Sequence, residues 1–391
     1  RRGMWLTADS AYKAAVEALE KKRAEASSLT SDDDDEDVPS FTKRDGTQFI
    51  GDQSLPVLED IECADLVEGV SGAYGDHDEI ETGQAAVVAR NVDRYFIDTE
   101  GSFVFEPSSQ AYIDAWGRAL ADDGMPVKHM FDHVRRSFDA LPDKGSLVAQ
   151  AKESADLIAE LRKAEKVETY TGPVVFTGDA ATQLMWRMLA DDLSGTPSPT
   201  TDFDSASGQY NPVRSRLGRR ILPEEFDAVD DPTQKMLGDI PLMGAYDIDH
   251  EGVPAQKVQI IKDGMLESLL MSRTPSDKIA QSNGHGRGGW RGVEGTVGNL
   301  IFSAEGGLDR DALKDRLLEE AEREGLDHAY IIEQFDNPFV TGDGLTAAES
   351  WANHGGDRMP TTVAVRIDED GSETYVRGLS LEKPLIRDLE D

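Results

Sequence analysis

The sequence predicts an α+β fold with two domains, an α/β region followed by a β-rich region. Three observations predict it. The first half of the chain alternates helical and strand patterns. The second half carries two Asp-Gly dipeptides, at 263–264 and 370–371, each between apolar runs, which is the pattern of a tight β-hairpin. The helix-breaking pair Gly172-Pro173 separates the two halves, and we expect the main domain boundary near it.

The first element is a helix over about 6–26, because Tyr12, Val16 and Leu19 recur at i, i+4 and i+7. The acidic run 31–37 follows it. This run lacks the spaced ligands and the central glycine of a calcium-binding loop, and like-charge repulsion favours a solvated linker.

Three strands are expected next, at 85–90, 94–98 and 101–105, with a turn at Thr99-Glu100 between the last two. A second helix is expected at about 147–165, where apolar residues share one face.

In the second half we expect hairpins at 258–270 and 363–377, around the two Asp-Gly dipeptides. A helix is expected at about 309–324, with Gly325 as the glycine that follows its C-cap. A strand is expected at 329–335.

We therefore assign residues 1–44 to a helix and acidic linker, 45–166 to an α/β domain, and 167–391 to a β-rich domain. The chain begins Arg1-Arg2-Gly3, and its first methionine is at position 4. We expect it to be a fragment or a processed form of a longer protein, with 1–44 a remnant of the N-terminal domain and the C-terminal domain truncated.

The composition argues against several classes of function. With 40 Lys and Arg against 76 Asp and Glu, the 391-residue chain has a formal net charge of −36, which disfavours nucleic acid and anionic membranes as partners. No run approaches the ~20 apolar residues of a membrane span. The single cysteine, Cys63, excludes an intrachain disulfide and a Cys-rich zinc site. The compartment stays open, with the cytoplasm favoured over export.

His129 and His133 have i, i+4 spacing, which on a helix would place both imidazoles on one face. A zinc protease of the HExxH type needs glutamate after the first histidine, and Met130 stands there. We therefore interpret both residues as surface histidines on an amphipathic segment.

The segment 247–254 concentrates three carboxylates and a histidine just before a predicted hairpin. Asp249 and His250 could belong to a metal or acid–base site, but neighbouring side chains on an extended chain point to opposite faces. A turn with solvated charges is the favoured interpretation.

The segment 282–291 is rich in glycine and contains His285 and Arg287. Glycines let a backbone approach a ligand closely, and an arginine is notable in so acidic a chain. Neither the P-loop nor the dinucleotide-binding pattern is present. A site for a phosphate, a peptide carboxylate or a peptide main chain, and a flexible loop without a ligand, remain equally open.

Taken in order, four segments are similar to the motifs of one family. They lie at 170–181, 249–256, 262–266 and 282–287. Together they resemble the TldD/PmbA family, also called peptidase U62 or modulators of DNA gyrase. The segment 94–102 is similar to the family's strand that ends in Ser-Glu-Gly, and the resemblance covers about 45–391.

The resemblance implies an α/β N-terminal domain, a β-rich C-terminal domain, and dimers that enclose a peptide-binding cavity. In the TldD branch, one helix carries HExxxH, whose histidines bind the metal and whose glutamate acts as the base. The matching positions here are Trp186, Arg187 and Asp191, on a helix expected at 180–193. Tryptophan cannot ligate zinc, and arginine cannot act as a base near neutral pH.

The resemblance therefore implies the TldE-like (PmbA) branch, a subunit with no catalytic residues, metal or cofactor of its own. It would hold unfolded peptide and pair with a metal-bearing TldD-like partner or with itself. We expect the substrate-binding residues to be His285, Arg287, Asp249 and His250, with the 258–270 hairpin as part of the same wall. Two alternatives are an enzyme with non-zinc chemistry at the same cleft, using Asp249, His250 or His285, and a homodimeric peptide-binding module.

One expectation concerns stability. If Trp186 replaces a metal ligand, it should be buried in the space that the metal would occupy. Replacing it by alanine should then cost ~3–5 kcal/mol.

Overall fold

A computed structural model describes most of the chain and divides it into two compact units, residues 1–39 and 40–391. The acidic run 31–37 lies outside the described residues. The first unit contains α1 (Arg2–Ser28), which confirms the helix predicted over 6–26. The described residues are 2–28, 39, 41–56, 58, 63–197, 211, 213–289, 292–337, 358–382 and 384–389.

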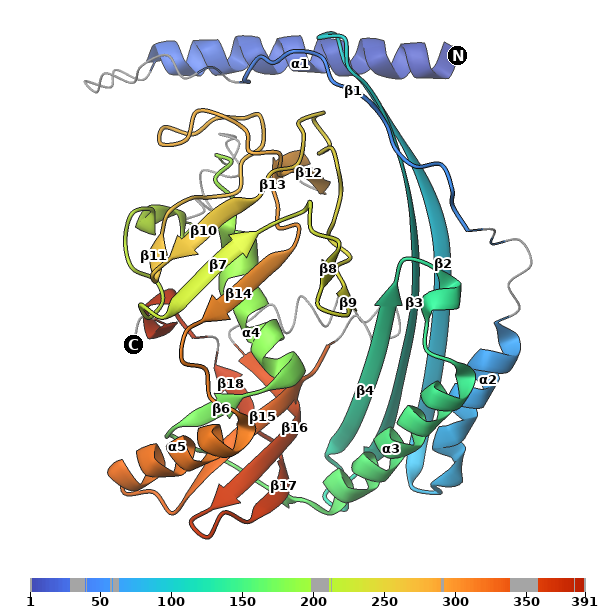
Figure 1. Ribbon diagram of the computed structural model, residues 1–391, viewed down its shortest axis with the longest axis vertical. Helices are drawn as coiled ribbons and strands as arrows, with labels where there is room; N and C mark the ends of the chain where they lie inside the picture. Colours follow the sequence, from blue (N-terminus) through green and yellow to red (C-terminus); the bar gives the residue numbers. More distant parts are fainter. Residues whose placement is uncertain are drawn as a thin grey trace. The chain divides into compact units, whose positions relative to one another are not determined.

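The first half of the second unit is built on a long, curved sheet, which is antiparallel except that the short strand β1 pairs with β3 in parallel (Figure 1). Its central strand, β3 (Phe103–Leu120), pairs along its whole length with β2 (Ile80–Ile97). The other edge of β3 takes β1 (Gln48–Ile50) at one end and β4 (Pro126–Arg135) at the other. The two strands expected at 85–90 and 94–98 are thus one continuous strand. The polar residues between them do not break it, because their backbone groups are paired with β3.

Two helices cover one face of this sheet, α2 (Ala64–Gly72) and α3 (Lys144–Lys163) (Figure 1). The predicted helix at 147–165 is confirmed by α3. Tyr74, from the 3-10 turn after α2, lies fully buried against the sheet. A Cβ on Gly117 of β3 would lie 2.7 Å from the Tyr74 ring, so this position needs glycine for the close approach.

The second half contains two further main sheets. A six-stranded sheet has the order β5–β17–β16–β15–β6, with β18 paired to β16, and a four-stranded sheet has the order β11–β10–β7–β14. The six-stranded sheet comprises β5 (Glu165–Lys166), β6 (Val174–Phe176), β15 (His328–Phe335), β16 (Arg358–Asp368), β17 (Glu373–Arg377) and β18 (Ser380–Glu382). The four-stranded sheet comprises β7 (Phe226–Asp230), β10 (Val258–Lys262), β11 (Met265–Leu266) and β14 (Leu300–Ala304).

Both predicted Asp-Gly hairpins are present, as β10–β11 and β16–β17. In the first, Asp263 and Gly264 have φ of 49° and 72°, the left-handed backbone that a two-residue hairpin turn requires. The predicted helix at 309–324 is α5 (Arg310–Arg323), and Gly325 follows it with φ of 75°. The predicted strand at 329–335 is part of β15.

The remaining elements include two small hairpins and α4 (Gly178–Leu189), which packs on β15. The hairpins are β8 (Met236–Leu237) with β9 (Ile240–Pro241), and β12 (Gly286–Gly289) with β13 (Gly292–Gly295). One apolar cluster, around Tyr74 and Ile158, comes mainly from the first half. Another, around Leu189, Ile260 and Phe335, comes from the second half. The boundary assigned at 166/167 stays a prediction. Among the described residues, none of the helices has the length and apolar character needed to cross a membrane.

Candidate functional site

The helix expected at 180–193 is present, but its tryptophan is not buried. Trp186 lies on α4 with 53% of its surface exposed, so the expectation that it fills a metal's former space is wrong. The cause is the rotation of the helix. Its buried face is formed by Ala180, Leu184 and Met188, at i, i+4 and i+8, and Trp186 is two residues, about 200°, away from Leu184.

The residues of α4 do not suit a zinc ion. A zinc ligand must offer a lone pair, which an indole ring does not, and the guanidinium of Arg187 would repel the ion. Asp191 lies in the 3-10 turn after α4. In the part of the chain that the structure describes, no three His, Cys, Asp or Glu side chains are grouped so that they could hold a metal.

The turn at 247–252 buries two of its carboxylates, so the expectation of solvated charges there is wrong for these two. Asp249 has no exposed surface, and Glu251 is 8% exposed. Asp249 accepts backbone N–H bonds from Glu251 (2.9 Å), Val253 (2.8 Å) and Gly286 (3.0 Å). Burial raises its pKa, and these three donors partly oppose the rise. The carboxylate therefore fixes the turn against β12.

His285 is also fully buried, and both of its ring nitrogens face oxygen acceptors. Nε2 lies 2.9 Å from Oδ1 of Asp230, and Nδ1 lies 3.0 Å from the carbonyl oxygen of Asn283. Asp230 also accepts from the backbone N–H of Gly298 at 3.1 Å. Because His285 has no exposed surface, it positions the hairpin β12–β13 rather than offering a surface to a ligand.

Arg287 lies on β12 of the same hairpin and His250 lies beside it, and both keep some exposed surface. The backbone N–H of His250 donates to the carbonyl of Gly286 (2.8 Å), and its Nδ1 accepts from the N–H of Gly288 (2.7 Å). Burial, and then the charges of Arg287 and Arg94, lower the pKa of His250 to about 4. The ring is therefore neutral at pH 7, and its proton is on Nε2. Arg287 lies over the Tyr246 ring, 4.2 Å from its centroid.

Two arginines that the sequence reasoning missed bind this turn, Arg94 on the long sheet and Arg44 in the segment before β1. Arg94 of β2 donates to the carbonyls of Asp249 (3.0 Å) and Ile248 (2.7 Å) and pairs with Glu106 of β3. Arg44 donates to the carbonyl of Glu251 (2.9 Å). The structure therefore brings all four predicted site residues together, around one turn and one hairpin. No local signal marks these two arginines, which are two of 25 in the chain.

His129 and His133 lie on the strand β4, not on a helix. Side chains four residues apart on a strand also share a face, and α3 covers this face. Nδ1 of His129 lies 2.9 Å from Ser154 Oγ, and Nε2 of His133 lies 2.8 Å from Gln150 Oε1. Burial lowers the pKa of His129 to about 4. Their roles here are contacts between sheet and helix.

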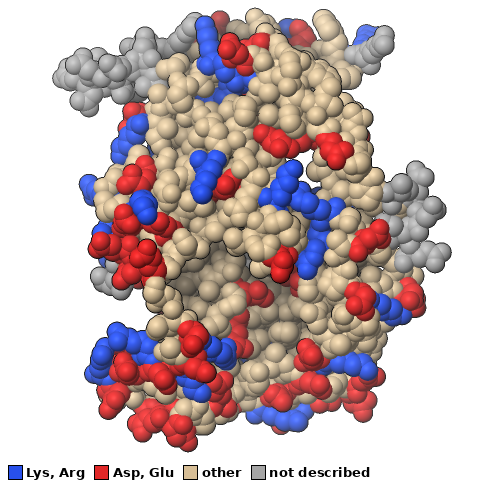
Figure 2. All heavy atoms as spheres, in the orientation of Figure 1, with Lys and Arg blue, Asp and Glu red and all other residues tan. Residues whose placement is uncertain are grey.

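The opposite face of the sheet carries a pair of carboxylates. Asp114 of β3 and Asp132 of β4 are directly paired across the strands. Burial, and then the charge of Asp132, raise the pKa of Asp114 to about 6. Burial and the charge of Asp179, at the start of α4, raise the pKa of Asp132. Figure 2 shows a hollow between the regions of α4 and β4, with acidic side chains inside it.

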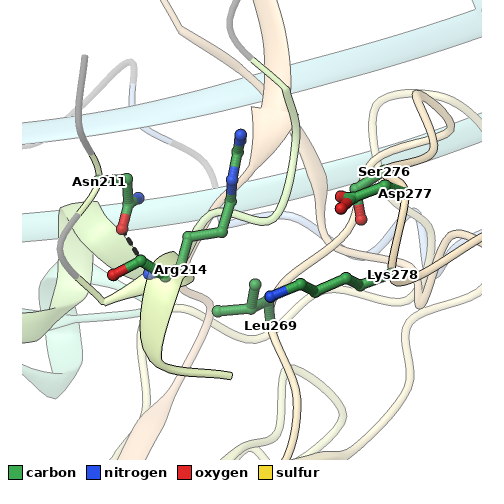
Figure 3. A pocket seen from close by; sticks show the side chains of 7 residues that line it. Asn211, Arg214, Leu269, Ser276, Asp277 and Lys278 are labelled. Atoms are coloured by element: carbon green, nitrogen blue, oxygen red, sulfur yellow. Dashed lines mark hydrogen bonds between the residues drawn. The ribbon is translucent and has the colours of Figure 1, made fainter. Parts of the chain in front are cut away.

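A separate cavity is lined in part by Leu269 and residues 276–278, which precede the glycine-rich segment 282–291 (Figure 3). Figure 3 shows Lys278 extending toward Leu269, with Ser276 and Asp277 close together on another side. The backbone N–H of Arg214 donates to Asn211 Oδ1 at 2.6 Å, which fixes that wall. Leu269 in turn accepts from Asn283 Nδ2 at 2.8 Å, next to His285. The lining residues are Asn211, Arg214, Ser215, Leu269, Ser276, Asp277 and Lys278.

Comparisons with known proteins identify relatives of this arrangement. Residues 169–349 match the family model of the PmbA/TldA metallopeptidase C-terminal domain. A metalloprotease from Archaeoglobus fulgidus is 35% identical over 75 residues, 19% of this chain. The metalloprotease PmbA from Escherichia coli O157:H7 is 28% identical over 130 residues, 32% of this chain. The aligned segments span only 16% and 26% of those two proteins.

Solved structures share the fold over most of the chain. A protein described as a modulator of DNA gyrase from Thermotoga maritima superposes with a TM-score of 0.61 at 15% identity, covering 88% of this chain and 73% of that one. TldE from Thermococcus kodakarensis superposes with a TM-score of 0.56 at 15% identity, covering 90% of this chain and 72% of that one.

Proposed function

The chain belongs to the TldD/PmbA family, and from that premise we propose that it is a TldE-like subunit of a metallopeptidase complex. In this role it has no catalytic metal of its own. It holds unfolded peptide for a metal-bearing, TldD-like partner.

The observation that carries this proposal is the composition of α4. The helix α4 includes the positions that the resemblance assigns to the first two motif residues, and its Leu184 and Met188 pack in the apolar core. Trp186 and Arg187 occupy the first two motif positions. A helix with these side chains supplies neither the first ligand nor the general base, whatever residues surround it.

Peptide holding is supported by the hairpin β12–β13. The outward backbone groups of Gly286 and Gly288 on β12 are already bonded to the turn at 247–252, so an extended peptide would add as a further strand beside β13, with affinity from backbone hydrogen bonds. The turn at 247–252 and the buried pair of His285 and Asp230 hold this hairpin in place. The 258–270 hairpin belongs to the adjoining four-stranded sheet.

Metal analysis combined with a peptidase assay tests the proposal. The purified chain should contain no stoichiometric zinc and should not cleave an unfolded peptide, and cleavage should appear on adding a TldD-like chain that carries HExxxH. The control is the TldD-like chain alone. If the present chain alone cleaves peptides and a chelator abolishes that activity, the proposal is wrong. Co-purification from native lysate separates a heteromer from a homodimeric peptide-binding module, because only the heteromer recovers the HExxxH chain.

A second candidate is an enzyme with non-zinc chemistry, at a place other than the turn and hairpin of the predicted site. Asp249 and His285 have no exposed surface, so the observation that favours this candidate lies elsewhere. Asp114 and Asp132 are paired carboxylates, and a pKa of about 6 allows Asp114 to hold a proton near neutral pH. Peptide turnover that survives a chelator and is lost in Asp114→Asn would favour it, and turnover in neither protein would exclude it.

A further inference from the structure

Arg287 is a half-buried cation for which the structure describes no hydrogen-bond or ion-pair partner. The other arginines of the site differ: Arg44, Arg94 and Arg273 all donate to backbone carbonyls, and each is also within ion-pair distance of a carboxylate. The guanidinium of Arg287 instead lies over the Tyr246 ring, and no hydrogen bond or ion pair joins it to a residue that the structure describes. A guanidinium has five N–H donors, and in a chain of net charge −36 an unmatched one is unusual.

The two carboxylates whose charges act on Arg287 already have other hydrogen-bond or ion-pair partners. Glu106 and Asp249 both act on its pKa, which burial lowers. Glu106 pairs with Arg94 and accepts the backbone N–H of Asp247 at 2.7 Å. Asp249 accepts three backbone N–H groups within the turn. Within the described residues, the donors of Arg287 are therefore open to a ligand.

His250 supplies a second donor beside the same hairpin. Its Nδ1 is occupied by the N–H of Gly288, so in the neutral ring Nε2 carries the hydrogen. No described residue accepts from that Nε2–H. The ring is held at the N–H of Gly288, the residue that follows Arg287 on β12.

We propose that Arg287 and the Nε2–H of His250 bind a carboxylate, and that this carboxylate is the C-terminus of a peptide held at the hairpin β12–β13. The ligand class rests on the proposed function, because it assumes a peptide. The guanidinium presents two parallel donors that match a carboxylate. His250 is neutral and Arg94 is paired with Glu106, so the site offers one unpaired positive charge, which suits a monoanion better than a phosphate dianion. A terminal carboxylate also needs no particular side chain, which agrees with binding through the main chain.

A pair of peptides tests the proposal. Each carries an N-terminal rhodamine on Gly-Ala-Val-Ala-Gly-Ala, and one ends in a free carboxylate while the other ends in an amide. Fluorescence anisotropy with the full chain should give about tenfold weaker binding of the amide. In Arg287→Gln the two peptides should bind equally. Arg118→Gln, which removes an exposed arginine of β3, is the matched control and should keep the tenfold preference.

The outcomes separate the two proposals. Equal binding of both peptides to the wild-type chain overturns the carboxylate site while peptide holding stands. A tenfold preference that persists in Arg287→Gln also overturns the site, because another residue must then recognise the carboxylate. If neither peptide binds, the proposed peptide-holding role is wrong. A second measurement then tests the carboxylate site by itself.

That second measurement uses only the wild-type chain and does not depend on a folded variant. Phenylglyoxal modifies accessible arginines, and mass spectrometry reports the modification at Arg287. N-acetylalanine should protect Arg287, whereas N-acetylalanine amide should not. Equal protection by both compounds, or protection by neither, would overturn the carboxylate site.

Discussion

Nε2 of His285 and Oδ1 of Asp230 lie 2.9 Å apart, and neither side chain has any surface exposed to solvent. This contact joins the start of the hairpin β12–β13 to the end of β7. Asp230 also accepts the backbone N–H of Gly298. The hairpin that we propose as the peptide-binding element therefore depends on a buried polar pair.

Removing one partner of this pair should be strongly destabilising. Asp230→Ala leaves the buried His285 Nε2 without an acceptor and also removes the acceptor of the Gly298 N–H, which typically costs ~3–5 kcal/mol. Urea unfolding followed by tryptophan fluorescence measures this. Glu81→Gln, in the exposed pair with Arg118 at 3.5 Å, is the control and should change stability by less than about 1 kcal/mol. An effect of Asp230→Ala no larger than that of the control would contradict the buried pair.

Trp186 and Leu184 lie two residues apart on α4, and truncation should reduce stability only slightly at Trp186 but strongly at Leu184. Trp186 is 53% exposed, so Trp186→Ala should cost less than about 1 kcal/mol. Leu184 is 8% exposed and belongs to the main apolar cluster, so Leu184→Ala should cost ~2–5 kcal/mol. Thermal and urea unfolding of both variants provide the measurement. A larger loss for Trp186→Ala than for Leu184→Ala would mean that the helix is rotated differently.

Arg44 should not be replaceable by lysine. Its guanidinium donates to Asp98 Oδ2 (2.8 Å), Thr47 Oγ1 (2.9 Å) and the carbonyl of Glu251 (2.9 Å), and a single ammonium cannot reach all three. We expect Arg44→Lys to destabilise the chain by ~1–3 kcal/mol in urea unfolding. The neighbouring exposed residue provides the control, because Lys43→Ala should be near neutral. Wild-type stability of Arg44→Lys would show that these donors are not used in solution.

Features set by neighbouring residues were predictable from the sequence. The turn at 263–264 was predictable because Asp-Gly tolerates the positive φ that both positions adopt. The end of α5 was predictable from Gly325, which follows the helix with a positive φ. The helix α3 follows from its periodic apolar face, most of which is buried. In each case the residues that determine the structure lie within one or two turns of chain.

Features set by distant residues were not predictable. Asp249 is buried because Gly286 donates to it and Arg94 and Arg44 bind its turn, and those partners lie 37, 155 and up to 207 positions away. Local sequence showed only a cluster of charges, which is usually solvated. Trp186 illustrates a different cause. The family motif locates its position along the helix, but not the rotation of the helix, which the spacing of Ala180, Leu184 and Met188 determines.

The pair Asp114–Asp132 should make stability fall as the pH rises. The pKa of Asp114 is raised from 3.8 to about 6, so between these values the native state binds more protons than the unfolded state. The resulting penalty is absent below about pH 3.8, grows through this window and is complete above about pH 6.

The substitution Asp114→Asn removes this penalty. The variant should be more stable than wild type at pH 8, by about 1 kcal/mol after allowing for solvent screening at this partly exposed group, and the gain should shrink at pH 5. Urea unfolding at both pH values measures it. Asp93→Asn, on an exposed position of β2, controls for the loss of one negative charge and should show no such pH dependence. The same gain for Asp114→Asn at pH 5 and pH 8 would mean that Asp114 is ionised across the whole range, and that the carboxylate pair holds no proton.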